Sequence, residues 1–222
     1  MHSFLPYGRQ MIDDDDVAAV VETLRADYLA QGPQVERMEK TICEITGAKY
    51  CVVVSNATAG LHLSVTALGL APGTEGITSP ITFVASANCL VYNGLIPCFA
   101  DIDPRTYCID PKEIEKRITP RTRVLVPVDF AGQAADMEAI KAIADKHGLR
   151  IVEDAAHAIG SKYSDGSMVG SCKHSDLTVF SFHPVKTVTT GEGGAVTTND
   201  KALFDRLSLL RSHGIEKDPA KI

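Results

Sequence analysis

The chain has 222 residues, 45% of them hydrophobic and 23% charged, which is enough for one large globular domain with a sizeable core. Its formal net charge of −6 argues against a surface for nucleic acid or for anionic membranes. No apolar run approaches the length of a membrane span, and residues 1–10 do not resemble a signal peptide, so we expect a cytoplasmic protein.

The six cysteines favour the same compartment. None of them is arranged as Cys-x-x-Cys, and several lie inside apolar runs, where a free thiol behaves as a small hydrophobic side chain. We therefore expect reduced thiols and no metal site.

The first predicted helix, residues 14–30, overlaps a run of four aspartates at 13–16. Such a run could suggest cation binding, but acidic side chains are favoured at a helix N-terminus, so we interpret it as a helix cap. Hydrophobic residues recur at helical spacing on one face of this helix: Val17, Val20, Val21, Leu24 and Tyr28.

Strand and helix patterns alternate through the rest of the sequence. The further predicted helices are 34–46, 58–68, 83–93, 111–118, 136–147 and 200–212, and the predicted strands are 50–54, 75–78, 95–100, 123–128, 150–154, 177–182 and 194–198. The clearest amphipathic helix is 136–147, which is followed by Gly148. This alternation predicts an α/β fold with a mostly parallel sheet and helices on both faces.

A candidate anion site lies where the strand 50–54 passes through small residues into the helix 58–68. Unpaired backbone N–H groups at a helix N-terminus bind phosphate readily, and Thr58 adds a hydroxyl. The segment has neither Gly-Lys-Ser/Thr nor a spaced glycine triplet, which excludes the P-loop and dinucleotide motifs. Thr58 could equally be a plain helix cap.

A candidate acid, Asp154, ends the buried strand pattern 150–154. Ligands of open α/β sheets gather at the carboxyl ends of strands, where a carboxylate can hold the proton on a cofactor's ring nitrogen. The alternative role of Asp154 is a helix N-cap. His157 follows among alanines, where a histidine is usually a satisfied core residue, but here it could hydrogen-bond a hydroxyl of the cofactor ring.

A candidate nucleophile, Lys186, lies between the apolar strand 177–182 and a glycine-rich turn at 190–194. An amine among apolar neighbours loses part of its proton affinity and can condense with an aldehyde as a Schiff base. Ser181 offers a hydroxyl to a phosphate. The alternative is that Lys186 is a surface lysine in a loop. However, a ligand with an aldehyde, a phosphate and a protonated ring nitrogen, as the three candidate sites require, is pyridoxal phosphate.

These motifs together resemble the DegT/DnrJ/EryC1/StrS family of sugar aminotransferases, which are fold-type-I pyridoxal-phosphate enzymes. The resemblance extends over nearly the whole chain and includes these segments: Pro6-Tyr7, Leu29-Ala30-Gln31-Gly32-Pro33, Pro80-Ile81-Thr82-Phe83-Val84-Ala85 and Arg211-Ser212-His213-Gly214. It implies that Lys186 carries the cofactor as a Schiff base and that Asp154 pairs with the pyridine nitrogen.

The resemblance also implies the remaining contacts of the cofactor. Backbone amides and hydroxyls of three positions would hold the phosphate: Thr58, Ala59 and Ser181. Phe83 would stack on the ring, although it could otherwise be an ordinary core residue.

The implied activity is transfer of an amino group from L-glutamate to C4 of a 4-keto-6-deoxy nucleotide sugar, with pyridoxamine phosphate as the intermediate form of the cofactor. By the same resemblance, residues 1–222 form the cofactor-binding large domain, and we expect a smaller C-terminal domain beyond residue 222. A homodimer is expected, in which the partner subunit contributes to each active site.

Several positions depart from the commonest family pattern. His157 stands where many members have glutamine, Thr187 where they have asparagine, and Glu192 where they have aspartate. His157 together with the segments 160–163, 188–192 and 211–215 resembles the branch of UDP-4-amino-4,6-dideoxy-N-acetyl-β-L-altrosamine transaminases in pseudaminic acid biosynthesis. This resemblance implies UDP-2-acetamido-2,6-dideoxy-β-L-arabino-hex-4-ulose as acceptor. Tyr7 and Gln31 are candidates for touching the sugar nucleotide, or they pack the N-terminal helix.

Three alternatives stay open on the same scaffold. The enzyme could aminate another keto sugar or a cyclitol. It could be a sugar dehydratase, although such relatives carry histidine in place of the lysine, and Lys186 argues against this. It could also be a protein that binds the cofactor without turnover.

Overall fold

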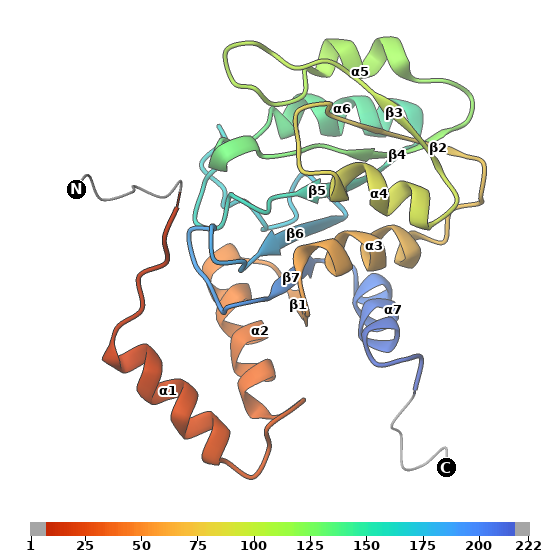
Figure 1. Cartoon of the computed structure of the whole chain (residues 1–222). Coiled ribbons are helices and arrows are strands. Elements are labelled where there is room, and N and C mark those ends of the chain that lie inside the picture. The colour runs from red at the N-terminus through yellow and green to blue at the C-terminus, as the bar shows by residue number, and fades with distance from the viewer. Residues whose placement is uncertain (1–7, 216–222) are drawn as a thin grey trace.

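The structure, a computed structural model, describes residues 8–215 and is built around a seven-stranded sheet with the order β1-β7-β6-β5-β4-β2-β3 (Figure 1). Its strands are β1 (Tyr50–Val54), β2 (Glu75–Thr78), β3 (Ile96–Phe99), β4 (Thr122–Val126), β5 (Arg150–Asp154), β6 (Leu177–Ser181) and β7 (Gly194–Thr198). All seven coincide with predicted strands to within two residues at either end.

The sheet is mixed but mostly parallel, as predicted. The strands from β3 through β2, β4 and β5 to β6 run parallel, whereas β7 runs antiparallel to both β6 and β1. No helix separates β6 from β7, so the chain turns straight back along the sheet, and a direct return of this kind gives an antiparallel pair. The loop that makes this return carries Lys186.

Helices cover both faces of the sheet. The helices are α1 (Asp14–Arg25), α2 (Pro33–Thr46), α3 (Ala57–Leu68), α4 (Ala85–Tyr92), α5 (Pro111–Arg117), α6 (Met137–His147) and α7 (Lys201–Arg211), with a short 3-10 helix η1 (Phe130–Gly132). Successive strand residues point to opposite faces, so Val152 joins the core under α3, α4 and α7 while Ile151 joins the core on the α6 side.

The predicted amphipathic helix is α6. Asp136 caps it by accepting the Ala139 N–H at 3.2 Å, and Gly148 ends it with a left-handed φ of 65°. Its buried residues are Met137, Ile140 and Ala144, which belong to the predicted apolar face. Local capping and periodicity therefore specified this helix completely.

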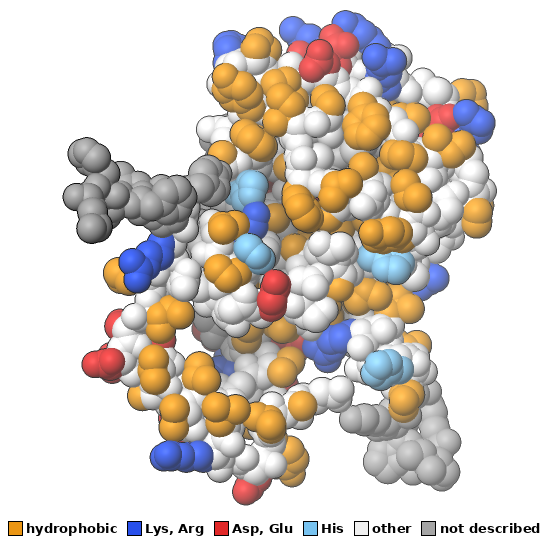
Figure 2. All heavy atoms as spheres, in the orientation of Figure 1, with side chains coloured by type: hydrophobic (Ala, Val, Ile, Leu, Met, Phe, Trp, Pro, Cys, Tyr) orange, Lys and Arg blue, Asp and Glu red, His pale blue; other side chains and the backbone are white. Residues whose placement is uncertain are grey.

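Helix α1 differs from its prediction. Asp13 forms the expected cap, but the helix ends at Arg25, and Ala26 is already extended. None of its residues is buried, and Figure 1 shows it lying apart from the sheet. Figure 2 shows hydrophobic side chains over this helix. Val20 and Leu24 in the helix are 60% and 61% exposed. A helix without buried residues is stabilised only by its cap and by its local helix propensity. This accounts for its end at Arg25, before the predicted residue 30.

The described residues also bear on membrane spans and on the cysteines. Among the helices of residues 8–215, none is long and apolar enough to cross a bilayer. The six cysteines are free thiols, and burial raises the pKa of several, with that of Cys89 reaching about 12.

Candidate functional site

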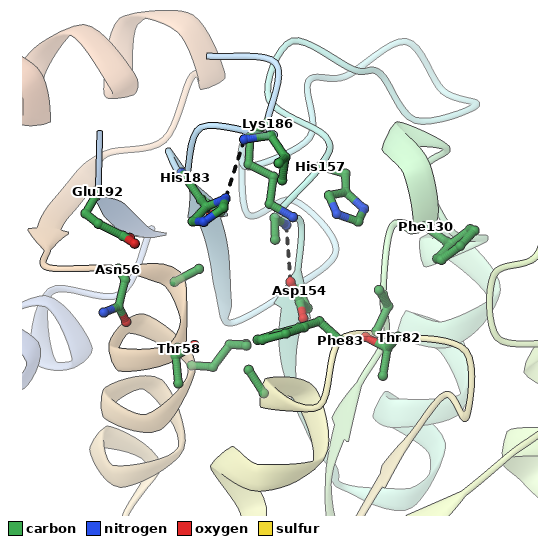
Figure 3. Close-up of a pocket in the computed structure, with 17 residues that line it drawn as sticks. Asn56, Thr58, Thr82, Phe83, Phe130, Asp154, His157, His183, Lys186 and Glu192 are labelled. Atoms are coloured by element: carbon green, nitrogen blue, oxygen red, sulfur yellow. Dashed lines mark hydrogen bonds between the residues drawn. The ribbon is translucent and has the colours of Figure 1, made fainter. Parts of the chain in front are cut away.

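A cavity of about 340 Å³ opens at the carboxyl ends of β4, β5 and β6, beside the N-terminus of α3. Figure 3 labels ten of its lining residues: Asn56, Thr58, Thr82, Phe83, Phe130, Asp154, His157, His183, Lys186 and Glu192. Five of the predicted site residues are in this group, and Ser181 also lines the cavity. Residues from distant parts of the chain therefore meet where ligands of parallel sheets bind.

The N-terminus of α3 forms one wall of the cavity. Asn56, and not Thr58, is its cap, because the Asn56 side chain accepts the Ala59 N–H at 2.8 Å. Ala57 and Thr58 line the cavity, in the first turn, where helical N–H groups have no intrahelical acceptor. This wall can hold a phosphate.

Strand β7 keeps the α3 cap in place. A side chain on Gly194 would put its Cβ within 2.5 Å of the backbone carbon of Asn56. Glycine at this position therefore lets the strand approach the cap closely, which fixes the direction of the first helical turn.

Asp154 ends β5 and is only 4% exposed. Its Oδ2 accepts the Ser86 hydroxyl at 2.6 Å, and its Oδ1 accepts the Ala156 N–H at 3.2 Å. Burial raises the pKa of this carboxyl, and the hydrogen bond from Ser86 opposes the rise. No helix begins between β5 and β6 in the described chain, so the N-cap alternative is wrong.

Lys186 lies in the loop from β6 to β7 and is partly buried. Its backbone N–H donates to the carbonyl of His183 at 2.9 Å, which closes the turn that carries it. Burial lowers the pKa of the amine, and the nearby Asp154 carboxylate opposes this. In Figure 3, Lys186, Asp154, His157 and Phe83 lie around one space. An amine with lowered proton affinity facing a cavity is suited to attack an aldehyde.

His157 is held by the segment that follows β4. Its Nδ1 accepts the Ala131 N–H at 3.2 Å, and its ring packs edge-on against Phe130 at 6.4 Å between centroids. Burial and the charge of Lys186 lower the pKa of the imidazole, and Asp154 opposes them. Because Nδ1 is an acceptor, the neutral ring carries its proton on Nε2 and can donate a hydrogen bond from there.

Phe83 and Ser181 also contribute to the cavity. Phe83 is 68% exposed, so the alternative of an ordinary core residue is wrong. Its exposed ring lines the cavity and can stack on a planar ligand. Ser181 is buried, and its hydroxyl accepts the His183 N–H at 3.4 Å.

Two residues predicted to touch the ligands, Ala59 and Gln31, do not line the cavity. Ala59 does not line the cavity, and its N–H is taken by the side chain of Asn56. Gln31 precedes α2 with a left-handed φ of 53° and is not a lining residue. Tyr7 lies outside the described residues. The roles proposed for these residues stay predictions.

Several lining residues were not singled out from the sequence. Asn56 had a usable signal, because asparagine directly before a helix is a preferred cap. Glu192 was noted as a departure from the commonest family pattern but not as a lining residue. Phe130 and His183 had no signal beyond their nearness to other candidates, since loop residues are placed by the fold rather than by periodicity.

One cluster of ionisable groups lies outside the cavity. Glu138, Asp165 and His174 have ligand atoms within 4.8 Å of one another. However, the Lys173 ammonium lies 2.5 Å from Asp165 Oδ2, in a position that a cation would need. We therefore assign no metal to this cluster.

The cavity fits pyridoxal phosphate. It has a helix N-terminus for the phosphate, a partly buried amine for the aldehyde and a buried carboxylate for the ring nitrogen. The exposed face of Phe83 is available to the ring. Fold and pocket together define the class of fold-type-I pyridoxal-phosphate-dependent transferases.

The chain belongs to the DegT/DnrJ/EryC1/StrS aminotransferase family, whose sequence model matches residues 10–221. Aminotransferases of this family use pyridoxal phosphate. The spore coat polysaccharide biosynthesis protein SpsC of Bacillus subtilis (strain 168) is 46% identical over 214 residues, which are 96% of this chain and 54% of SpsC.

Solved structures agree with this family. Helicobacter pylori PseC, an aminotransferase involved in the biosynthesis of pseudoaminic acid, is 39% identical with a TM-score of 0.89, over 96% of this chain and 57% of PseC. NtdA from Bacillus subtilis, with bound cofactor PMP, is 33% identical with a TM-score of 0.84, over 92% of this chain and 47% of NtdA. The chain thus spans about half the length of these relatives.

Proposed function

We propose that the protein transfers an amino group from L-glutamate to the keto carbon of a nucleotide sugar, with pyridoxal phosphate and pyridoxamine phosphate as alternating cofactor forms. The observation that carries this proposal is the Lys186 amine facing the same cavity as the buried Asp154 carboxylate and the α3 N-terminus. A sugar dehydratase is disfavoured because Lys186 occupies the position of the reactive amine.

Lys186 acts twice in this mechanism. Its amine would hold the cofactor through the aldehyde carbon, with loss of water, until an amino donor takes its place. The free amine, whose pKa is lowered by burial, would take the proton from the donor α-carbon as a general base and give it back as a general acid. Bound pyridoxal phosphate supplies the electron sink for these proton transfers.

The other residues bind and orient. Asp154 would hold the proton on the pyridine nitrogen. His157, whose Nδ1 accepts the Ala131 N–H, would donate from Nε2 to the ring hydroxyl. Thr58, Ser181 and the first turn of α3 hold the phosphate. Phe83 covers one face of the ring.

We propose UDP-2-acetamido-2,6-dideoxy-β-L-arabino-hex-4-ulose as the acceptor. The similarity to PseC, whose name refers to pseudoaminic acid, supports this choice, and so does the sequence pattern around His157 and Glu192. Tyr7 and Gln31 stay candidates for contacts with the sugar nucleotide.

We further propose that residues 1–222 are the cofactor-binding part of a homodimeric, cytoplasmic enzyme with a smaller C-terminal domain. The share of its relatives that the chain spans supports the second domain. Large exposed hydrophobic residues next to the cavity support a partner surface: Ile81, Phe83 and Val84. Six free thiols are consistent with a reducing compartment.

Borohydride reduction of the cofactor-loaded protein, followed by peptide mapping, tests the lysine. The expected result is one reduced cofactor adduct on Lys186 and none in Lys186→Ala. Lys162→Ala is the control, because Lys162 is a neighbouring loop lysine that does not line the cavity. An adduct on another lysine would contradict the proposal.

A panel of acceptors tests the substrate. The proposed sugar should have a kcat/KM well above that of its D-xylo epimer and of a dTDP-linked 4-keto sugar, because a mismatched hydroxyl leaves buried polar groups unpaired. If either competitor is used tenfold better, the acceptor is wrong while the aminotransferase proposal stands.

A further inference from the structure

A chain of two hydroxyls lies behind Asp154 on the side of α4. The Ser86 hydroxyl oxygen is 2.6 Å from Asp154 Oδ2, and the Thr82 hydroxyl oxygen is 2.6 Å from that of Ser86. Ser86 has no exposed surface, whereas Thr82 is partly buried and lines the cavity. Figure 3 shows Thr82 beside Phe83, near the Asp154 carboxylate. The hydroxyls thus connect the carboxylate to the cavity wall.

The direction of these hydrogen bonds follows from their chemistry. An ionised carboxylate only accepts, so Ser86 must donate its single proton to Asp154. The Phe83 carbonyl is a competing acceptor for that proton, but it lies at 3.2 Å rather than 2.6 Å. Once Ser86 donates to Asp154, its oxygen accepts from Thr82, and each bond strengthens the next.

The two hydroxyls offset the free-energy cost of burying the charged Asp154 carboxylate. Burial favours the neutral form of Asp154, while the proposed reaction needs the ionised form to hold the pyridine proton. Only two hydrogen bonds to this carboxylate are found within the described residues, from Ser86 and from the Ala156 N–H. The bond from Ser86 is the shorter of the two, at 2.6 Å against 3.2 Å.

We propose that Ser86, supported by Thr82, is a positioning residue that keeps the Asp154 carboxylate ionised and fixes the direction of its free lone pairs toward the cavity. This inference rests on the proposed function, because the carboxylate needs its charge for the ring nitrogen. A purely structural role, in which Ser86 only ties α4 to β5, would leave the titration of Asp154 unchanged.

Carbon-13 NMR of the aspartate carboxyls in the protein without cofactor tests the charge directly, with Asp154→Asn assigning the signal. In Ser86→Ala the Asp154 titration should move to higher pH, and in Ser86→Thr it should return to the wild-type position. Thr82→Val, which keeps the shape and removes the outer hydroxyl, should move it in the same direction by less.

Ser64→Ala is the matched control, since the buried Ser64 hydroxyl donates to the Gly60 carbonyl of its own helix and should not affect Asp154. In the cofactor-loaded protein, Ser86→Ala should slow the glutamate half-reaction about tenfold in kcat with little change in KM. An unchanged Asp154 titration in both Ser86→Ala and Thr82→Val would overturn the inference. Failure of Lys186 to bind the cofactor would instead overturn the proposed function.

Discussion

Two neighbouring carboxylates of β5, Glu153 and Asp154, are both buried but point to opposite faces of the sheet. Asp154 faces the cavity and α4, with one hydroxyl and one N–H as partners. Glu153 faces the α6 side and accepts three hydroxyls, from Tyr163 at 2.6 Å, Thr178 at 2.6 Å and Ser175 at 3.2 Å. One strand therefore carries both a carboxylate open to a ligand and one that is fully enclosed.

The Glu153 side also holds a second buried acid, Asp129. Its Oδ1 accepts the Ala135 N–H at 2.9 Å, and within the described residues no donor reaches its Oδ2. Burial and the charge of Glu153 raise the pKa of Asp129 well above its usual range. We therefore infer that Asp129 is neutral, since two adjacent carboxylates cannot both stay charged in the core.

The difference shows what makes a buried acid available for chemistry. Glu153 has its lone pairs taken by protein hydroxyls, so it can only stabilise the fold. Asp154 keeps acceptor capacity on the cavity side, where a ligand can use it. Burial is the same for both, and the number of protein donors separates them.

The largest expected effect is on activity. Asp154→Asn should slow the glutamate half-reaction by about 10³-fold, or about 4 kcal/mol, because a neutral amide cannot hold the pyridine proton. Single-turnover kinetics measure the rate, and thermal unfolding checks that the fold is kept. A rate within about threefold of wild type would make Asp154 as purely structural as Glu153.

The second effect is on stability. Glu153→Ala should cost about 3 kcal/mol of unfolding free energy, because it leaves the buried hydroxyls around it without their acceptor. Glu44→Ala, at a largely exposed helix position, is the control and should change stability by less than about 0.5 kcal/mol. Urea denaturation measures both. Equal losses in the two variants would contradict the enclosed role of Glu153.

A third, smaller effect depends on pH. A carboxyl whose folded pKa lies above its ordinary value of 3.8 binds more protons in the folded state than in the unfolded state. Its contribution to stability therefore falls as pH rises from about 4 through the folded pKa. Asp129→Asn removes this titration and keeps a neutral side chain of the same shape. Because wild type loses this contribution as the pH rises and the variant does not, the variant should gain stability relative to wild type as the pH rises above about 4. A difference that stays constant with pH would show that Asp129 does not titrate with a raised pKa.

The smallest effect concerns His157. In His157→Gln the amide can still donate toward the ring hydroxyl, so the half-reaction should slow by only about threefold. His157→Ala, which removes the donor, should be slower than the glutamine variant. Equal rates for both would mean that the hydrogen bond has no part in the reaction.

Much of the fold could be predicted because its signals are local. The strands and α6 follow from periodicity and caps, which involve residues only a few positions apart. The reversed direction of β7 and the early end of α1 could not be predicted, because strand direction and helix packing depend on distant partners.

The site residues likewise fall into those that local signals predict and those that they do not. Asp154 and the α3 N-terminus could be predicted because each lies at the end of an element that the sequence marks. Lys186 could be predicted because it lies in the loop that follows such an element, β6. Ser86 was missed because its bond to Asp154 joins residues 68 positions apart.

By itself, the sequence determined the alternation of strands and helices, their caps, and the reactive groups at strand ends. It singled out Asp154 at the end of a buried strand, whereas its neighbour Glu153 carried no prediction. Only the tertiary structure decided that one is enclosed by hydroxyls and the other faces a cavity. The physical reason is that side-chain alternation is local, whereas the donors around each carboxylate come from segments that packing brings together.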